Sequence, residues 1–406
     1  MNVLERFLRY VSYDTQSDEH SETVPSTDKQ RLLGAQLVED LKEIGIQDAQ
    51  LDAYGYVYGN LPATPGCEHL PVCCLIAHMD TSPDAPGASV RARVVDYHGG
   101  DVVLNEAQNI VLSPKEFPSL NQYQGQHLVV TDGTTLLGAD DKAGLAEIVT
   151  AVAYLMQHPE LPHGRIALAF TPDEEVGRGA DHFDLQRVQA DYGYTVDGGA
   201  LGELEYENFN AAHAEVQFYG RNIHPGEGKD KLINAVLMVC EFVNLLPAAQ
   251  TPAHTEGYEG FFHVNRIEGE EGHAMVHLLI RDHNRDRFED RKRVLQSIVT
   301  FLNQRWGQGR VALHIQDSYY NMREKIEPHM ELIHRAEEAF RKAGVTPRVV
   351  PIRGGTDGAR LSYEGLPCPN LSTGGLNYHG VYEYVPVESM EAMVKVLVHL
   401  VTREPE

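Results

Sequence analysis

The chain has 406 residues and a formal net charge of -25, because 59 acidic residues outnumber 34 basic ones. A field of this sign repels phosphate backbones and anionic lipid, so it argues against nucleic-acid and membrane-surface partners. Five cysteines, an odd number without framework spacing, argue against a disulfide-stabilised secreted protein and favour a reducing compartment.

The first half of the chain alternates strand-like and helix-like segments. Residues 1–16 show helical periodicity with charges throughout, unlike a cleavable leader, and no run reaches the roughly 18 apolar residues of a membrane span. We therefore expect a cytoplasmic protein. Strands are expected at 70–80, 164–175 and 190–199, with a helix at 144–158. This order predicts an α/β fold with a mostly parallel sheet sandwiched by helices.

Two stretches depart from that alternation. Residues 98–135 indicate short strands and turns, which we interpret as an insertion near the site. Residues 209–320 follow the order strand, helix, strand, strand, helix, strand, which matches a ferredoxin-like α+β unit. We expect 209–320 to be an inserted lid and dimerisation domain. Residues 1–208 and 321–406 then form a discontinuous catalytic domain.

Histidine and acidic residues stand where expected strands end and in two turns between elements. They are His78 and Asp80, Glu174 and Glu175, Asp197, Asp140 and His379. In an open α/β sheet, ligands gather at the carboxyl ends of the strands, so these side chains are expected to converge.

Two imidazoles and several carboxylates suit zinc, and two zinc ions about 3.5–4 Å apart can share one carboxylate. We interpret Asp140 as the shared ligand, although spacing alone leaves the choice of bridge open. His78 and Asp197 then complete one ion, and Glu175 and His379 complete the other.

Asp80 and Glu174 are expected to support this centre from outside the ligand set. Residues i and i+2 of a strand project to the same side, so the Asp80 carboxylate can accept the ring N–H of His78 and fix its tautomer. Glu174 points away from its neighbour Glu175 and can act as the general base.

Simpler interpretations exist for the turn residues. Asp140 and Asp141 could cap the following helix, and Glu174 with Glu175 could form a solvated acidic turn. The first alternative is compatible with metal binding if Asp141 caps the helix and Asp140 binds the ion.

The segments HMDTSPD (78–84), GADDKAG (138–144), TPDEEVGRGA (171–180) and TVDGG (195–199) resemble the M20 metallopeptidase family, as does the histidine near the C-terminus. Further segments, among them 10–18, 220–235 and 371–380, are similar to its bacterial tripeptide aminopeptidases. The resemblance covers nearly the whole chain. It implies two zinc ions per subunit, a cytoplasmic homodimer, and the ligand, orienting and base roles given above.

The resemblance also implies a reaction and its substrate. A water bridging two zinc ions and activated by Glu174 would attack the first carbonyl of a tripeptide with a free N-terminus. His224 resembles a family histidine that donates to the oxyanion, and Arg281 and Arg353 are candidates to pair with the peptide's C-terminal carboxylate.

Two alternative functions stay open at this point. A di-zinc amidohydrolase of N-acyl amino acids or dipeptides would use the same metal chemistry. A non-catalytic binding protein predicts loss of the base, and Glu174 is present.

Overall fold

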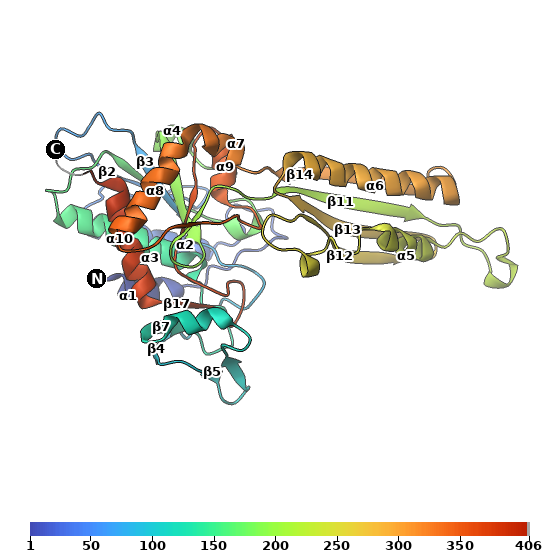
Figure 1. Ribbon diagram of the computed structural model, residues 1–406, viewed down its shortest axis with the longest axis horizontal. Coiled ribbons are helices and arrows are strands. Elements are labelled where there is room, and N and C mark those ends of the chain that lie inside the picture. The colour runs from blue at the N-terminus through green and yellow to red at the C-terminus, as the bar shows by residue number, and fades with distance from the viewer. Residues whose placement is uncertain (404–406) are drawn as a thin grey trace. The chain divides into compact units, whose positions relative to one another are not determined.

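The computed structural model describes residues 1–403. They form two compact units (Figure 1). The first unit comprises Met1–Tyr206, Glu324–Val350 and the chain from Thr356 onward, and the second comprises Glu207–Arg323 with Pro351–Gly355.

An eight-stranded mixed sheet forms the centre of the first unit, in the order β1-β2-β8-β3-β9-β16-β10-β15. Its strands are β1 (Gln50–Leu51), β2 (Val57–Leu61), β3 (Cys73–His78), β8 (Ile166–Thr171), β9 (Tyr192–Gly198), β10 (Glu203–Glu205), β15 (Arg348–Val349) and β16 (Asn370–Ser372). The central strands β8, β3, β9 and β16 are parallel, as expected. The sheet is mixed because β2 and β10 pair antiparallel to these central strands.

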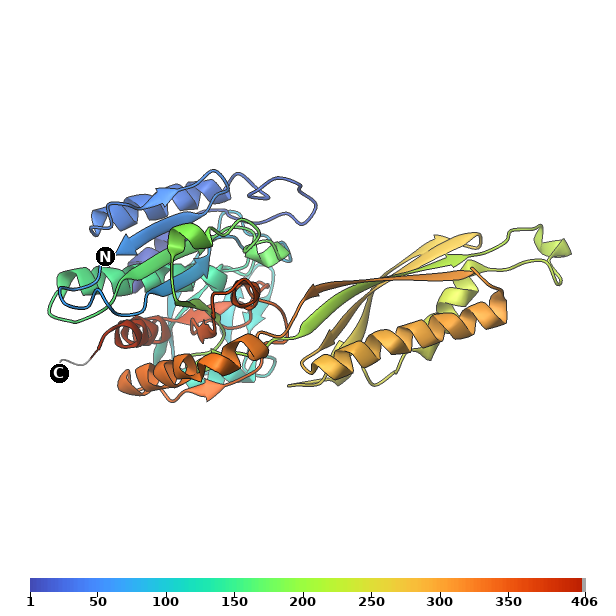
Figure 2. The ribbon, with the colours of Figure 1, turned by 90° about the horizontal axis from the view of Figure 1, so that it is seen from above.

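Helices lie on both sides of this sheet (Figure 2). They are α1 (Val3–Val11), α2 (Gln30–Glu43), α3 (Ala139–Gln157), α4 (Leu185–Val188), α8 (Met330–Lys342), α9 (Asp357–Tyr363) and α10 (Val387–Val401), while α7 (Arg323–Ile326) spans the boundary between the units. A capping box starts α1, in which Asn2 and Glu5 exchange side-chain to main-chain hydrogen bonds. Helix α3 packs against α1 and α10 and against β3 and β9, so the long central helix is buried beside the strands that end at the site.

The stretch 98–135 forms short strands, as predicted. Strands β5 (Val102–Asn105) and β6 (Ile110–Leu112) pair with each other, and β7 (Gln126–Val130) lies between β4 (Arg93–Tyr97) and β17 (Tyr384–Pro386). Tyr97, Leu128 and Tyr384 share its core. The pairing of β17 with β7 therefore brings the segment after His379 next to the segment before Asp140.

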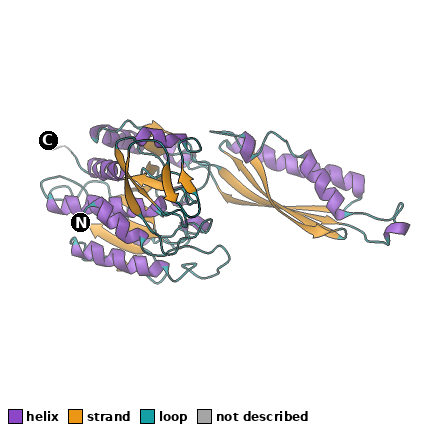
Figure 3. Cartoon of the chain, turned by 90° about the horizontal axis from the view of Figure 1, so that it is seen from below, coloured by secondary structure: helices purple, strands orange, loops and turns teal. Residues whose placement is uncertain are grey.

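The second unit is a four-stranded antiparallel sheet with two helices (Figure 3). Its elements are β11 (Asn210–Tyr219), α5 (Ala235–Leu245), β12 (Phe261–Glu270), β13 (His273–Asp282), α6 (Arg285–Trp306) and β14 (Val311–Tyr319). Alternate residues of β11, among them Val216 and Phe218, join Phe242 and Phe288 in one core. The order of elements is the one predicted for 209–320, and the role of this unit as a lid stays a prediction. Within residues 1–403, no helix combines the length and apolar composition needed to cross a bilayer.

Candidate metal centre

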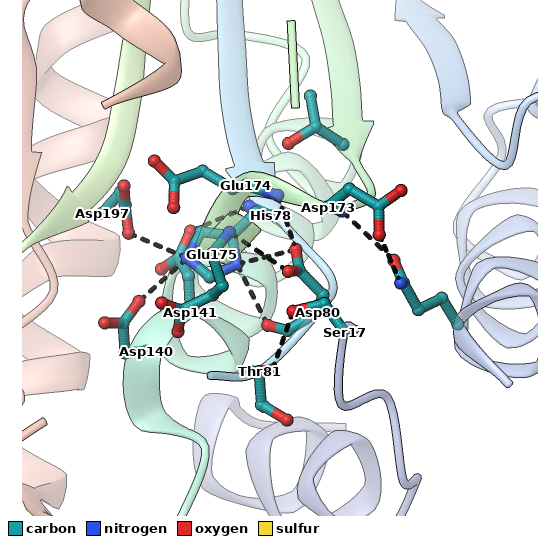
Figure 4. Close-up of polar contacts among 12 residues, drawn as sticks. Ser17, His78, Asp80, Thr81, Asp140, Asp141, Asp173, Glu174, Glu175 and Asp197 are labelled. Carbon is teal, nitrogen blue, oxygen red and sulfur yellow. Dashed lines mark hydrogen bonds and ion pairs between the residues drawn. The ribbon is translucent and has the colours of Figure 1, made fainter. Parts of the chain in front are cut away.

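Three neighbouring parallel strands carry the first site residues at their carboxyl ends. His78 ends β3, Asp197 lies near the end of β9, and Glu174 and Glu175 follow β8 in a single 3-10 turn. Since β8, β3 and β9 are adjacent, these side chains meet at one edge of the sheet (Figure 4).

Asp140 reaches the same edge from the start of α3. The main chain at Asp140 and Asp141 is not helical, and the peptide bond between them is cis. Asp141 Oδ1 accepts from the N–H of Gly144 at 3.3 Å, as a helix cap does, and its Oδ2 accepts from the N–H of His78 at 3.0 Å. These contacts agree with a capping Asp141 beside an Asp140 that faces the cluster.

His78 is deeply buried, with 2% of its side chain exposed. Its Nε2 lies 2.9 Å from Asp140 Oδ1 and 3.2 Å from Asp197 Oδ1. Its Nδ1 lies 3.0 Å from the main-chain oxygen of Asp80 and 3.4 Å from Oδ1 of that residue. The closer acceptor for the ring is therefore the main chain of Asp80 rather than its carboxylate.

The Asp80 carboxylate instead holds the acidic turn. Its two oxygens accept from the main-chain N–H groups of Glu174 and Glu175 at 3.0 and 3.2 Å. Asp80 thus links the end of β3 to the turn after β8.

His379 makes a second set of contacts with the same carboxylates. Its Nε2 lies 2.9 Å from Glu175 Oε2 and 3.3 Å from Asp140 Oδ2, and its Nδ1 lies 3.1 Å from Asp84 Oδ2. Asp140 therefore faces His78 with one oxygen and His379 with the other, which is the arrangement that a bridging carboxylate needs.

The carboxylates of Asp140, Glu175 and Asp197 lie close together, so Asp140 raises the cost of negative charge on the other two. Burial raises the pKa of Glu175 to about 8, to which Asp140 adds, and burial raises the pKa of Asp197 to about 6. Contacts with Asp140 and Glu175 raise the pKa of His379 to about 11. The environment thus favours added positive charge.

The donor set fits a divalent cation. Ligand atoms of His78, Asp141 and Asp197 lie within 4.8 Å of one another, as do those of His78, Asp140 and Glu175. Within the described residues, Glu175 Oε1 is buried without a hydrogen-bond partner. Imidazole nitrogen and carboxylate oxygen are ligands that zinc accepts. From the sequence we expected Asp141 only to cap the helix, and its position beside His78 and Asp197 was missed.

The chain itself matches a known family. Residues 128–403 match peptidase family M20/M25/M40. The chain is 53% identical to peptidase T of Clostridium acetobutylicum and 52% identical to peptidase T of Halothermothrix orenii, each over 98% of both chains. The chain belongs to peptidase family M20/M25/M40.

Solved structures show the same fold. Aminopeptidase PepT from Bacillus cereus has a TM-score of 0.77 and 22% identity, with 98% of this chain and 97% of that chain covered. A dinuclear metal-binding peptidase of family M20 from Bacillus subtilis has a TM-score of 0.65 and 12% identity, with 98% and 96% covered.

Glu383 supports the centre of this M20 chain and was missed from the sequence. Its carboxylate accepts from the N–H groups of Leu137 at 2.6 Å, Gly138 at 2.8 Å and Asp140 at 3.1 Å. Burial raises its pKa to about 7. Its local sequence carries no signal for this role, because the pairing of β17 with β7 brings it to the Asp140 turn.

The other three predicted site residues lie in the second unit. His224 Nδ1 accepts from the N–H of Gly226 at 3.2 Å. The Arg281 guanidinium donates to the main-chain oxygens of Ala212 and Ile280 at 3.1 and 3.0 Å. Arg353 donates to main-chain oxygens within 255–259. The substrate roles of these residues stay predictions.

Proposed function

We propose that this M20 chain is a metal-dependent aminopeptidase that releases the first residue of tripeptides with a free N-terminus. The observation that carries the proposal is Asp140, which faces a histidine with each carboxylate oxygen. Support also comes from two relatives named peptidase T, which are 53% and 52% identical to this chain. The likeness to the two solved structures reported above, at 22% identity or less, extends only to the fold.

Two zinc ions are the cofactors that we propose. His78, Asp140 and Asp197 would hold one ion, and His379, Asp140 and Glu175 would hold the other. Bound there, zinc would supply Lewis-acid polarisation and a water of lowered pKa.

Glu174 is the proposed general base. Burial raises its pKa, and the negative charge of Asp197 adds to this. A carboxyl group with a raised pKa can take up a proton and return it near neutral pH. The Asp80 carboxylate fixes the main chain of Glu174, so the base is held beside the ligands without being one of them.

Recognition of the rest of the peptide is proposed for the second unit. His224 would donate to the oxyanion, and Arg281 and Arg353 would pair with the C-terminal carboxylate of the substrate. Main-chain oxygens orient both guanidinium groups, which favours a fixed geometry for such a pair. We also propose a cytoplasmic homodimer, on the grounds of the family resemblance, the cysteine pattern and the acidic charge.

A comparison of three substrates tests the proposal. The zinc-loaded protein is given a free tripeptide, its N-acetylated form and a dipeptide, and the products are identified by mass spectrometry. We expect one free amino acid and one dipeptide from the free tripeptide alone. Cleavage of the acetylated peptide at the same rate would exclude an aminopeptidase and favour an amidohydrolase.

A further inference from the structure

Asp84 contacts His379 on the side of the ring opposite the ligand cluster. Its Oδ2 lies 3.1 Å from Nδ1, whereas Nε2 faces Asp140 and Glu175. We propose that Asp84 is a positioning residue, which accepts the Nδ1–H of His379 and keeps Nε2 directed at the ion held with Glu175. This inference rests on the proposed two-zinc function.

The chemistry of the ring explains why the partner is a carboxylate. With an ion at Nε2, the imidazole keeps a single proton, and that proton is on Nδ1. An ionised carboxylate can only accept, so Asp84 selects the tautomer that leaves the Nε2 lone pair for the metal. A carboxylate in this place also raises the basicity of the ligating nitrogen.

The main chain on both sides of Asp84 is held in place, although its side chain is 66% exposed. The Gln16 amide donates to the main-chain oxygens of Ser82 at 3.1 Å and Ala85 at 2.8 Å. The Ser82 hydroxyl accepts from the N–H of Asp84 at 3.2 Å. The carboxylate is therefore presented from a constrained turn.

His379 has little other support. Its side chain is 42% exposed, and its φ of 61° is in the left-handed region, which non-glycine residues adopt at a cost. His78, by contrast, is 2% exposed at the end of a central strand. A ring with so little packing around it depends on its hydrogen bonds for orientation.

An ordinary surface ion pair is the competing explanation. Such pairs contribute about 0–1 kcal/mol to stability and have no effect on a distant ligand. The chain offers a matched control, because Asp96 Oδ1 lies 3.3 Å from Nε2 of His127 in a pair that is 72% and 54% exposed. Neither residue belongs to the candidate centre.

Zinc titration of the metal-free full chain against a chromophoric chelator separates the two explanations. We expect the unmodified protein to bind two ions. Asp84→Ala should weaken one of them by about 10- to 100-fold and leave the other unchanged, since loss of such a partner typically has this effect. Asp84→Asn keeps an acceptor oxygen and should give a smaller loss, and Asp96→Ala should match the unmodified protein.

Thermal unfolding of the metal-free proteins completes the test. The melting temperatures of Asp84→Ala and Asp96→Ala should equal that of the unmodified chain, because both pairs are exposed. Two unchanged zinc affinities in Asp84→Ala, or a lowered melting temperature that accounts for its zinc loss, would overturn the role of Asp84. If the unmodified chain bound no zinc and cleaved no tripeptide, the proposed function would fail and the Asp84 inference with it.

Discussion

The two halves of the candidate centre are built alike and supported differently. In each half, the Nε2 of a histidine faces Asp140 and one further carboxylate, from Asp197 beside His78 and from Glu175 beside His379. His78 ends a central strand and is 2% exposed, whereas His379 lies in a loop and is 42% exposed.

This difference separates two ways of holding a ligand. Packing within the sheet holds the His78 half, because its ring is almost fully buried and the main-chain N–H of His78 donates to Asp141. Side-chain contacts across loops hold the His379 half. We therefore expect tighter zinc binding in the His78 half, and the His379 half to be more sensitive to residues outside the ligand set.

Removal of Asp140 should have the largest effect, because it is common to both halves. In Asp140→Ala each ion loses a ligand, so we expect no detectable tripeptide cleavage and a loss of zinc from both positions. Zinc content after dialysis, measured by mass spectrometry, checks this. Retention of one ion at full occupancy would mean that Asp140 serves only one half.

Glu174 belongs to neither half, so its removal should affect the reaction and not the metals. Glu174→Gln is expected to keep both zinc ions and to lower kcat by about 10²- to 10⁴-fold, the usual contribution of a general base. Steady-state kinetics on a free tripeptide, with zinc content measured on the same sample, test this assignment. A fall in zinc content would instead make Glu174 a ligand.

The contrast in burial can be tested without metal. His78→Ala leaves Asp140 and Asp197 without their shared partner in a buried place, and loss of one member of a buried pair costs about 3–5 kcal/mol. His379→Ala should cost less than His78→Ala, because the His379 ring is 42% exposed and its pairs with Asp140 and Glu175 are partly screened by solvent. Urea unfolding of the metal-free variants measures both values. Equal losses would contradict the division into a packed half and a loop half.

The same contrast explains what the sequence could predict. His78, Asp197 and the Glu174–Glu175 pair follow apolar runs that indicate buried strands, and parallel strands place their ends together. His379 follows no such run, and only the family resemblance singled it out. Strands β3, β8 and β9 were predicted for the same reason, while β10, β15 and β16 are too short to show any periodicity.

Residues that act through contacts distant in the sequence were missed. Glu383 reaches the Asp140 turn across more than 240 residues, and Asp84 reaches His379 across 295. Asp84 lies inside the HMDTSPD motif, which gives a weak signal, whereas Glu383 stands just before the short strand β17 and in no motif. Sequence periodicity reports which side of an element is buried, and it carries no information about which distant turn that side meets.

Replacement of Glu383 should have a smaller effect on zinc binding, and it tests whether the Asp140 turn serves both ions. Its two oxygens have different donors: Oε1 accepts from the N–H of Asp140, and Oε2 accepts from the N–H groups of Leu137 and Gly138. In Glu383→Gln one oxygen becomes an NH₂ group that faces a main-chain donor, so the turn must shift. Because the turn carries the shared ligand, we expect both zinc affinities to fall, by about 10-fold each.

Chelator competition measures this outcome beside that of Asp84→Ala, which should weaken one ion only. Glu388→Gln is the matched control, because Glu388 also accepts from a main-chain N–H, that of His127, at an exposed position. If Glu383→Gln weakened a single ion, the Asp140 turn would not be common to both halves. The turn that carries Asp140 would then support one half of the centre and not the other.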